Sequence, residues 1–197
     1  MMQDYNTDYF IDALERLSFK LSSRQIEGEF DFYIIGGFCL MLHGLRTSTM
    51  DIDSYMDREL NIENLILEVG IEIGNPDWLN SDIDNLDTIP KLETLLKIED
   101  SFVINRKIGQ INIYIATLKT VLFTKIVAAM SRELQRDIRD ILSITTRTGI
   151  SEKMLTELRE FEGCDFDVLS TWLSILYEHA RIDETTFRQL YDYILNI

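Results

Sequence analysis

The stretch FYIIGGFCLMLHGLRTSTMDIDSYM, residues 32–56, decides the fold. It joins an apolar run, a Gly-Gly pair and an Asp-Ile-Asp alternation. Because side chains two residues apart on a strand point to the same face, Asp51 and Asp53 are expected to project together. Two parallel carboxylates repel unless a cation lies between them, and Mg²⁺ typically takes one or two carboxylates and fills its remaining positions with water and phosphate oxygens. The stretch therefore predicts a site for a metal ion and a phosphate group.

Gly36 and Gly37 lie where a short apolar strand is expected to pass into a helix. The missing side chains let the backbone approach a phosphate, and a helix N-terminus offers N–H groups to an anion. A plain tight turn is the alternative interpretation. The downstream Asp-x-Asp pair favours the phosphate-binding interpretation.

These residues resemble the signature of the nucleotidyltransferase (polymerase-beta-like) superfamily, in which an apolar strand, Gly-Gly or Gly-Ser and a loop precede Asp-x-Asp. More narrowly, LHGLRTSTMDID is similar to the GLRxTxDID block of a bacterial group of uncharacterised nucleotidyltransferases related to the AbiEii-type toxins of toxin–antitoxin systems. Two further blocks agree in order: PDWLN at residues 76–80 and a lysine followed by Arg-Asp within residues 124–144. The resemblance covers about residues 30–145.

The resemblance implies a Mg²⁺-dependent transferase with one or two ions, in which an acceptor hydroxyl attacks the α-phosphate of a nucleoside triphosphate. Asp51 and Asp53 would then be the metal ligands and catalytic carboxylates. Lys125 would contact the triphosphate and offset its charge. Arg136 and Asp137, the Arg-Asp pair, would lie near the nucleotide, with Asp137 as a catalytic residue.

Arg46 and Thr49 belong to the loop that leads into the aspartate strand. The planar fork of Arg46 is suited to a phosphate, and the hydroxyl of Thr49 is suited to a ribose or a phosphate. An equal alternative is that Arg46 neutralises the nearby carboxylates. Both residues therefore count as nucleotide-binding candidates, together with Gly36 and Gly37.

A third carboxylate, which many superfamily members take from a neighbouring strand, is missing where the resemblance places it. The strand expected within residues 110–116 offers Asn112, whose amide can ligate Mg²⁺ but carries no charge and cannot act as a base. Either another acid such as Asp100 substitutes, or the site works with fewer carboxylates, or catalysis is impaired. The alternative function is thus a catalytically impaired nucleotide- or partner-binding module with the same fold.

The formal charge of −15 argues against a protein coated with nucleic acid or docked on an anionic membrane. Residues 119–149 are the exception, because this segment contains six basic residues and three acidic ones. On one continuous helix Lys125, Arg132, Arg136 and Arg139 would form a basic stripe, but a helix break is expected near Ser131. Such a stripe could bind a triphosphate or an acceptor RNA. The alternative interpretation is that these residues are solvent-exposed charges on a helix, without a ligand.

The resemblance implies an acceptor that is tRNA or another RNA, a protein side chain or a small molecule, and a toxin-like role with an antitoxin protein as partner. No apolar run is long enough to span a bilayer, and the first ten residues lack a secretion signal, so a cytoplasmic location without a membrane partner is expected. Cys39 and Cys164 stand far apart without ligand spacing, which makes a zinc site improbable.

The hydrophobic pattern predicts an α+β fold. A small mixed sheet with flanking helices would form a nucleotidyltransferase core at residues 1–117, and a helical C-terminal region at residues 118–197 would pack on it. The stretch from residue 75 to residue 90 has no apolar period and predicts an irregular loop. A third helix is expected to start at Asn61 as N-cap.

Overall fold

The computed structural model describes residues 4–56, 62–81, 83, 89–98, 100–132, 135–161 and 164–197, with the backbone alone for residues 130–132 and 135–136. The chain divides into two compact units. Unit 1 comprises Met1–Leu86 and Glu99–Thr117, and unit 2 comprises Asp87–Ile98 and Leu118–Ile197. The second part of unit 1 ends at Thr117, and residues 87–98 group with the helical unit.

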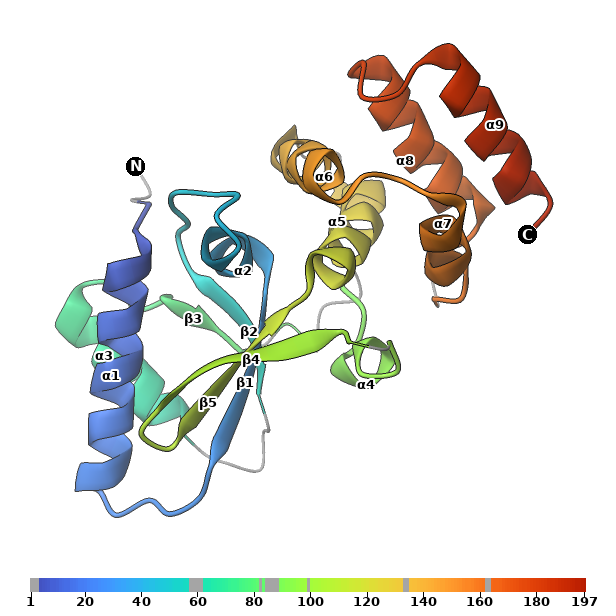
Figure 1. The fold of residues 1–197 in the computed structure, drawn as a ribbon. Coiled ribbons are helices and arrows are strands. Elements are labelled where there is room, and N and C mark those ends of the chain that lie inside the picture. Colours follow the sequence, from blue (N-terminus) through green and yellow to red (C-terminus); the bar gives the residue numbers. More distant parts are fainter. Residues whose placement is uncertain are drawn as a thin grey trace. The chain divides into compact units, whose positions relative to one another are not determined.

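Unit 1 is built on a five-stranded mixed sheet with the strand order β3-β2-β1-β5-β4 (Figure 1). The strands are β1 (Phe30–Ile35), β2 (Ile52–Met56), β3 (Leu79–Asn80), β4 (Phe102–Ile108) and β5 (Ile111–Ala116). The central strand β1 pairs antiparallel with β2 and parallel with β5. Among the described residues this arrangement confirms the prediction of an α+β fold with a small mixed sheet.

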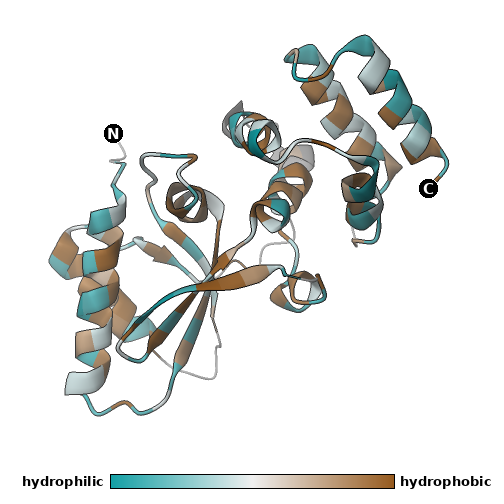
Figure 2. Ribbon diagram, in the orientation of Figure 1, coloured by the Kyte–Doolittle hydropathy of each residue, from teal (hydrophilic) through white to brown (hydrophobic). Residues whose placement is uncertain are grey.

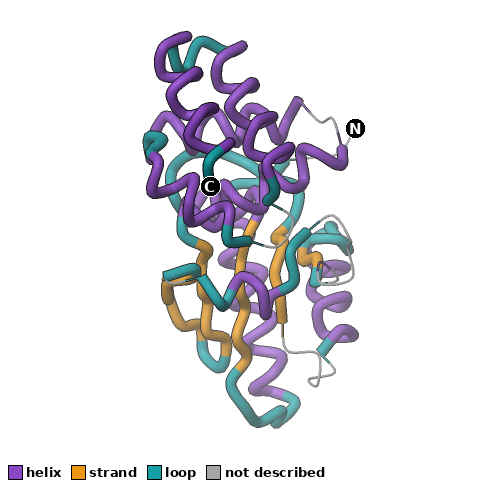
Figure 3. Tube along the Cα trace, turned by 90° about the vertical axis from the view of Figure 1, so that its right-hand side faces the viewer, coloured by secondary structure: helices purple, strands orange, loops and turns teal. Residues whose placement is uncertain are grey.

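Three helices accompany the sheet: α1 (Thr7–Ser23), α2 (Gly36–Leu42) and α3 (Glu63–Ile73). Helices α1 and α3 lie side by side on one face of the sheet, as Figures 1 and 3 show from two directions. The apolar positions of α1 recur every three or four residues, so Phe10, Leu14, Leu17 and Leu21 are all fully buried. Figure 2 shows apolar residues running through the sheet, with hydrophilic stretches near the β4–β5 turn.

Unit 2 is helical in its described part. Its helices are α4 (Leu92–Leu95), α5 (Leu118–Arg132), α6 (Gln135–Thr148), α7 (Glu152–Arg159), α8 (Phe166–Glu178) and α9 (Glu184–Leu195). Side chains of Ser151, Asp165 and Asp183 accept hydrogen bonds from backbone N–H groups in the first turns of α7, α8 and α9, which fixes where those helices begin. The prediction of a helical C-terminal region is confirmed, and the break expected near Ser131 is confirmed by the separate helices α5 and α6.

The middle of the chain, from residue 61 to residue 90, bears on two sequence-based expectations. The N-cap predicted at Asn61 lies outside the described residues, and the described helix α3 begins at Glu63. Residues 75–90, which were expected to form an irregular loop, contain the two-residue strand β3, and no hydrophobic pattern in the sequence predicts this strand. No helix in the described part of the chain is long and apolar enough to cross a bilayer.

Candidate functional site

The Gly-Gly pair and the aspartates meet through the pairing of β1 with β2. Ile35, the last residue of β1, lies opposite Asp53. Gly36 follows directly with a φ of 67°, and a Cβ atom built on it would lie 2.2 Å from Oδ2 of Asp53. Any side chain at position 36 would therefore both strain the backbone and displace the carboxylate. The backbone of the turn thus lies directly against Asp53.

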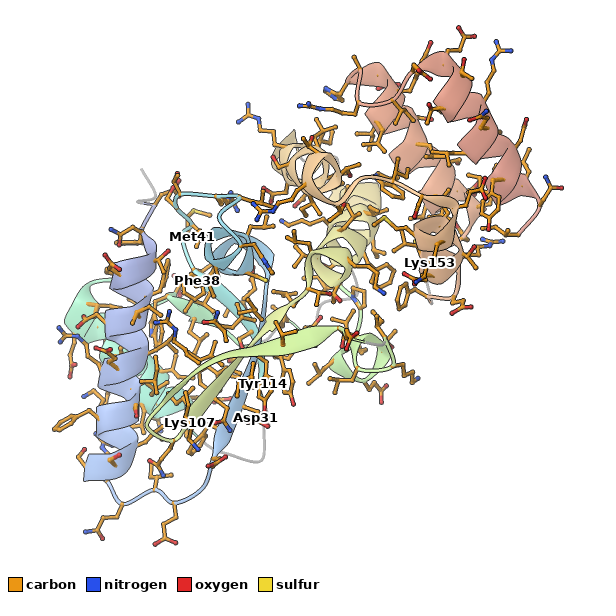
Figure 4. The ribbon with its side chains drawn as sticks, viewed as in Figure 1. Asp31, Phe38, Met41, Lys107, Tyr114 and Lys153 are labelled. Atoms are coloured by element: carbon orange, nitrogen blue, oxygen red, sulfur yellow. The ribbon has the colours of Figure 1, made fainter. Side chains whose placement is uncertain are left out.

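Gly37 makes a second close approach. A Cβ atom built on it would lie 2.4 Å from Oγ1 of Thr49 and 2.6 Å from Nη1 of Arg46. The guanidinium and the hydroxyl that the sequence analysis selected therefore both lie against this glycine. Phe38, the next residue, is fully buried and fastens α2 to the core (Figure 4).

Asp51 completes the unit 1 part of the predicted site. Along residues 51–53 the exposure alternates between half-buried, fully buried and half-buried. Because the buried Ile52 faces the core, Asp51 and Asp53 leave the opposite face of the extended segment. Within unit 1 the structure therefore brings Gly36 against Asp53 and Gly37 against Arg46 and Thr49, and Asp51 precedes Asp53 by two residues.

A short N-terminal segment braces the loop that carries Arg46 and Thr49. Tyr5 donates its backbone N–H to the carbonyl of Thr49 at 2.7 Å, and Thr49 donates in return to the carbonyl of Tyr5 at 3.0 Å. The ring of Tyr5 stacks on Tyr9 of α1 with centroids 4.0 Å apart, and Ser48 donates to Asp4 at 3.3 Å. A single bridge of this kind leaves no pattern in the sequence, so sequence analysis missed it.

Asn80 of β3 is a second residue that sequence analysis missed. Its Nδ2 atom donates to Oδ1 of Asp53 at 3.1 Å, and the two residues pair in the sheet register. The PDWLN block contains this asparagine, but no spacing rule assigns it to the aspartates. The structure therefore adds an amide to the carboxylate site.

Asn112 does not lie at this site. It pairs with Asp31, four residues before Ile35 on β1, which places it about 13 Å along the strand from the level of Asp53. Its amide donates to Glu29 at 3.0 Å and to Asp31 at 2.8 Å. Figure 4 shows Asp31 and Lys107 toward the end of the strands away from α2. The geometry therefore corrects the expectation that Asn112 takes the third position.

The surroundings of Asn112 form a separate polar network. Lys107 forms an ion pair with Glu29, and the hydrogen bonds from Lys107 and Asn112 hold the pKa of Glu29 below its usual value. Asp100, the other acid considered, precedes β4, three strands from β2 and therefore about 14 Å across the sheet. Neither residue supplies a third carboxylate beside Asp53.

Lys125 and Asp137 come together in unit 2, between α5 and α6. Nζ of Lys125 lies 2.7 Å from Oδ1 of Asp137 and 3.0 Å from Oδ2 of Asp140. These side chains are 15%, 9% and 10% exposed, so this is a buried ion cluster. The side chain of Arg136, the remaining nucleotide-binding candidate, lies outside what the structure describes.

With this geometry established, comparison with known proteins adds no relative. No family model, curated protein or solved structure matches this chain. The resemblance to nucleotidyltransferases therefore depends on the motif residues themselves.

The donor set at Asp53 suits a hard cation. Among the described residues no group of three or more histidines, cysteines or carboxylates is arranged for a metal ion. Two carboxylates and an amide are nevertheless oxygen donors of the kind that Mg²⁺ accepts, with water and phosphate completing its shell. The cysteines are unsuited to this role, because burial raises the pKa of Cys39 and of Cys164 to about 12.

Proposed function

We propose that this protein is a Mg²⁺-dependent nucleotidyltransferase that transfers a nucleoside monophosphate from a nucleoside triphosphate to an acceptor hydroxyl. The observation that carries the proposal is the contact of Gly36 with Asp53. It brings the first residue of α2, which has no side chain, against the second aspartate of the Asp-x-Asp pair. Arg46 and Thr49 lie against the neighbouring Gly37. Carboxylate oxygens, the guanidinium of Arg46 and the hydroxyl of Thr49 thus lie against one pair of glycines within unit 1.

The roles follow from the chemistry of each side chain. Asp51 and Asp53 would hold Mg²⁺, which when bound neutralises the triphosphate and polarises the α-phosphoryl group. Arg46 would bind a phosphate oxygen through its fork, and Thr49 would donate a hydroxyl hydrogen bond. The missing side chain of Gly36 lets Asp53 lie against the backbone, and that of Gly37 does the same for Arg46 and Thr49, so the groups that would bind the triphosphate are held close together.

In the proposed reaction a bond forms between the acceptor oxygen and the α-phosphorus. The bond from the α-phosphorus to the bridging oxygen of the β-phosphate breaks, pyrophosphate leaves, and the hydroxyl proton passes to solvent. RNA, including tRNA, a protein side chain and a small molecule are the acceptor classes that the family resemblance suggests. The same resemblance motivates a toxin-like role with an antitoxin partner.

A second candidate is a nucleotide- or partner-binding module that has lost turnover. It is favoured by the absence of a third carboxylate beside Asp53 in the part of the chain that the structure describes. It is favoured also by the contacts of Lys125, which is held by Asp137 and Asp140 within unit 2. Both observations argue against group transfer more strongly than against nucleotide binding.

The test is incubation of the purified protein with each α-labelled nucleoside triphosphate, Mg²⁺, and total cellular RNA or protein. We expect label to be transferred, and Asp51→Asn or Asp53→Asn to reduce the transfer about 100-fold or more, since a lost metal ligand removes several kcal/mol of transition-state stabilisation. Asp12→Asn, at a carboxylate 53% exposed on α1, is the matched control and should transfer normally.

Three outcomes are distinguishable. Transfer that depends on both aspartates supports the enzyme. Triphosphate binding that depends on the aspartates, without transfer to any acceptor, supports the binding module. Absence of aspartate-dependent binding as well as transfer contradicts both candidates.

A further inference from the structure

The strand β3 is two residues long, yet it pairs with β2 in a defined register. Ile52 lies beside Leu79, and Asp53 lies beside Asn80. Because side chains alternate across a strand, the first pair shares one face and the second pair shares the other. Ile52 is 0% and Leu79 7% exposed, so the first pair faces the core. The result is an amide level with Asp53 on the face that leaves the core.

The segment leading to Asn80 is fastened to α3 and to β2 by Trp78. This indole is fully buried, and its Nε1 atom donates to the carbonyl of Ile66 at 2.9 Å. The carbonyl of Trp78 accepts from the backbone N–H of Ile52 at 2.8 Å. The residue between the two aspartates is thus held by the segment that presents Asn80.

Asn75 fastens the same segment to the residue before Asp51. Its Nδ2 atom donates to the carbonyl of Met50 at 3.1 Å, and its backbone N–H donates to Gly70 at 2.8 Å. A Cβ atom built on Gly70 would lie 2.8 Å from the carbonyl oxygen of Asn75, so the segment packs directly on α3. The same supports therefore set the positions of Asn80 and of both carboxylates.

The carboxylate of Asp53 is oriented from two sides. Oδ1 accepts from Asn80 at 3.1 Å, and Oδ2 lies against Gly36. The amide torsion of asparagine is broad and roughly two-fold, so a half-turn exchanges its N–H₂ group for its oxygen. An amide oxygen is a neutral ligand that divalent cations accept.

We propose that Asn80 is the third member of the Asp51–Asp53 site. Its N–H₂ group orients Asp53 in the protein without a cation, and its oxygen becomes a ligand when a divalent cation is bound. A neutral third group leaves the site with two negative charges, so the cation is held more weakly than by three carboxylates. This inference rests on the proposed function and deepens it.

The test is Mn²⁺ binding without nucleotide, followed through the electron paramagnetic resonance signal of the free ion. We expect Asn80→Ala to weaken binding about 10- to 100-fold, the usual cost of removing a group that orients a ligand. Asn80→Asp adds a charged ligand and should tighten binding about tenfold or more. Asn105→Asp on β4 adds the same charge about 19 Å across the sheet and should leave binding unchanged.

Unchanged Mn²⁺ affinity in both Asn80 variants overturns the inference. If Asp51→Asn and Asp53→Asn still abolish binding in that case, the proposed function stands without it. If none of these substitutions alters Mn²⁺ binding, both the inference and the proposed function are overturned. Mn²⁺ binding that appears only in Asn80→Asp, or in no form of the protein, overturns the inference, because the amide of Asn80 would then hold no cation in the unaltered protein. Thermal unfolding checks each variant, and Asn80→Ser replaces Asn80→Ala if that variant does not fold.

Discussion

At the scale of single residues, Gly36 determines how closely the turn approaches the carboxylate. Its φ of 67° is a conformation that residues with a side chain rarely adopt, and its missing Cβ leaves space for Asp53. The sequence predicted that the Gly-Gly pair and the aspartates belong together. It could not predict that Gly36 meets Asp53 and Gly37 meets Thr49, because those contacts depend on the register between β1 and β2.

Gly36→Ala is expected to lower the free energy of unfolding more than Gly44→Ala. Gly44 has a φ of 71° with nothing within 4 Å of a built Cβ, so its substitution costs about 1–2 kcal/mol of backbone strain alone. At Gly36 the collision with Asp53 adds about 1–3 kcal/mol. Urea unfolding of both variants measures the difference. Equal losses would mean that Asp53 moves aside freely and that the close approach is unimportant.

Asn80 and Tyr5 were beyond sequence analysis for a common reason. Asn80 reaches Asp53 through a strand of two residues, and Tyr5 reaches Thr49 through one backbone bridge. Pattern analysis needs several residues of alternation, and neither contact supplies them. Such residues are found through the register of a structure.

At the scale of elements, α5 and α6 show how helix packing selects the partners of a lysine. The spacing of the basic residues suggested a stripe for a triphosphate, yet Lys125 packs against two carboxylates of α6. Removing water from three charges is costly, and the cluster is stable because each charge has an opposite neighbour. A hydrophobic period locates the helices, whereas the partner of a lysine depends on how the helices pack.

Lys125→Met is expected to cost about 3–5 kcal/mol of unfolding free energy, because it leaves Asp137 and Asp140 buried without their counter-charge. Lys119→Met is the matched control. Lys119 forms an ion pair with Glu157 at 3.1 Å, but both side chains are more exposed, at 28% and 33%, so the cost should stay below about 1 kcal/mol. Urea unfolding measures both variants, and a similar small loss in each would contradict a structural role for Lys125.

At the scale of the whole molecule, each unit has its own core and its own buried thiol. Cys39 lies in unit 1 and Cys164 in unit 2, and they are 0% and 1% exposed. Burial raises the pKa of both thiols from 9.0 to about 12, and Asp165 adds to the effect at Cys164. Both cysteines are therefore protonated and shielded in the folded protein.

Neither thiol is expected to react with Ellman's reagent at neutral pH, whereas both react once the chain is unfolded in urea. Cys39→Ala leaves Cys164 to report on unit 2, and Cys164→Ala leaves Cys39 to report on unit 1. Because the folded pKa exceeds the unfolded one, the thiols stabilise the fold fully below pH 9.0, and this contribution is lost as the pH rises toward about 12. Rapid labelling of the native protein, or stability that increases above pH 9.0, would contradict this assignment.

Long periodic segments made the overall architecture predictable. Strands β1 and β2 and the three C-terminal helices follow from alternation, helical spacing and capping residues such as Ser151 and Asp183. The sequence did not predict that residues 87–98 belong to unit 2, nor that Asn112 lies opposite Asp31. These two features depend on which segments pack together and on strand register, and neither is encoded in local spacing.

The backbone bridge between Tyr5 and Thr49 also bears on how the protein is handled. Anything fused ahead of Asp4 begins a few residues from the loop that carries Arg46. A flexible affinity tag at that end would compete for the space around the loop, and a histidine tag would bring metal ligands to a site proposed to bind metal. A tag ahead of Asp4 is therefore unsuited to assays of metal or nucleotide binding.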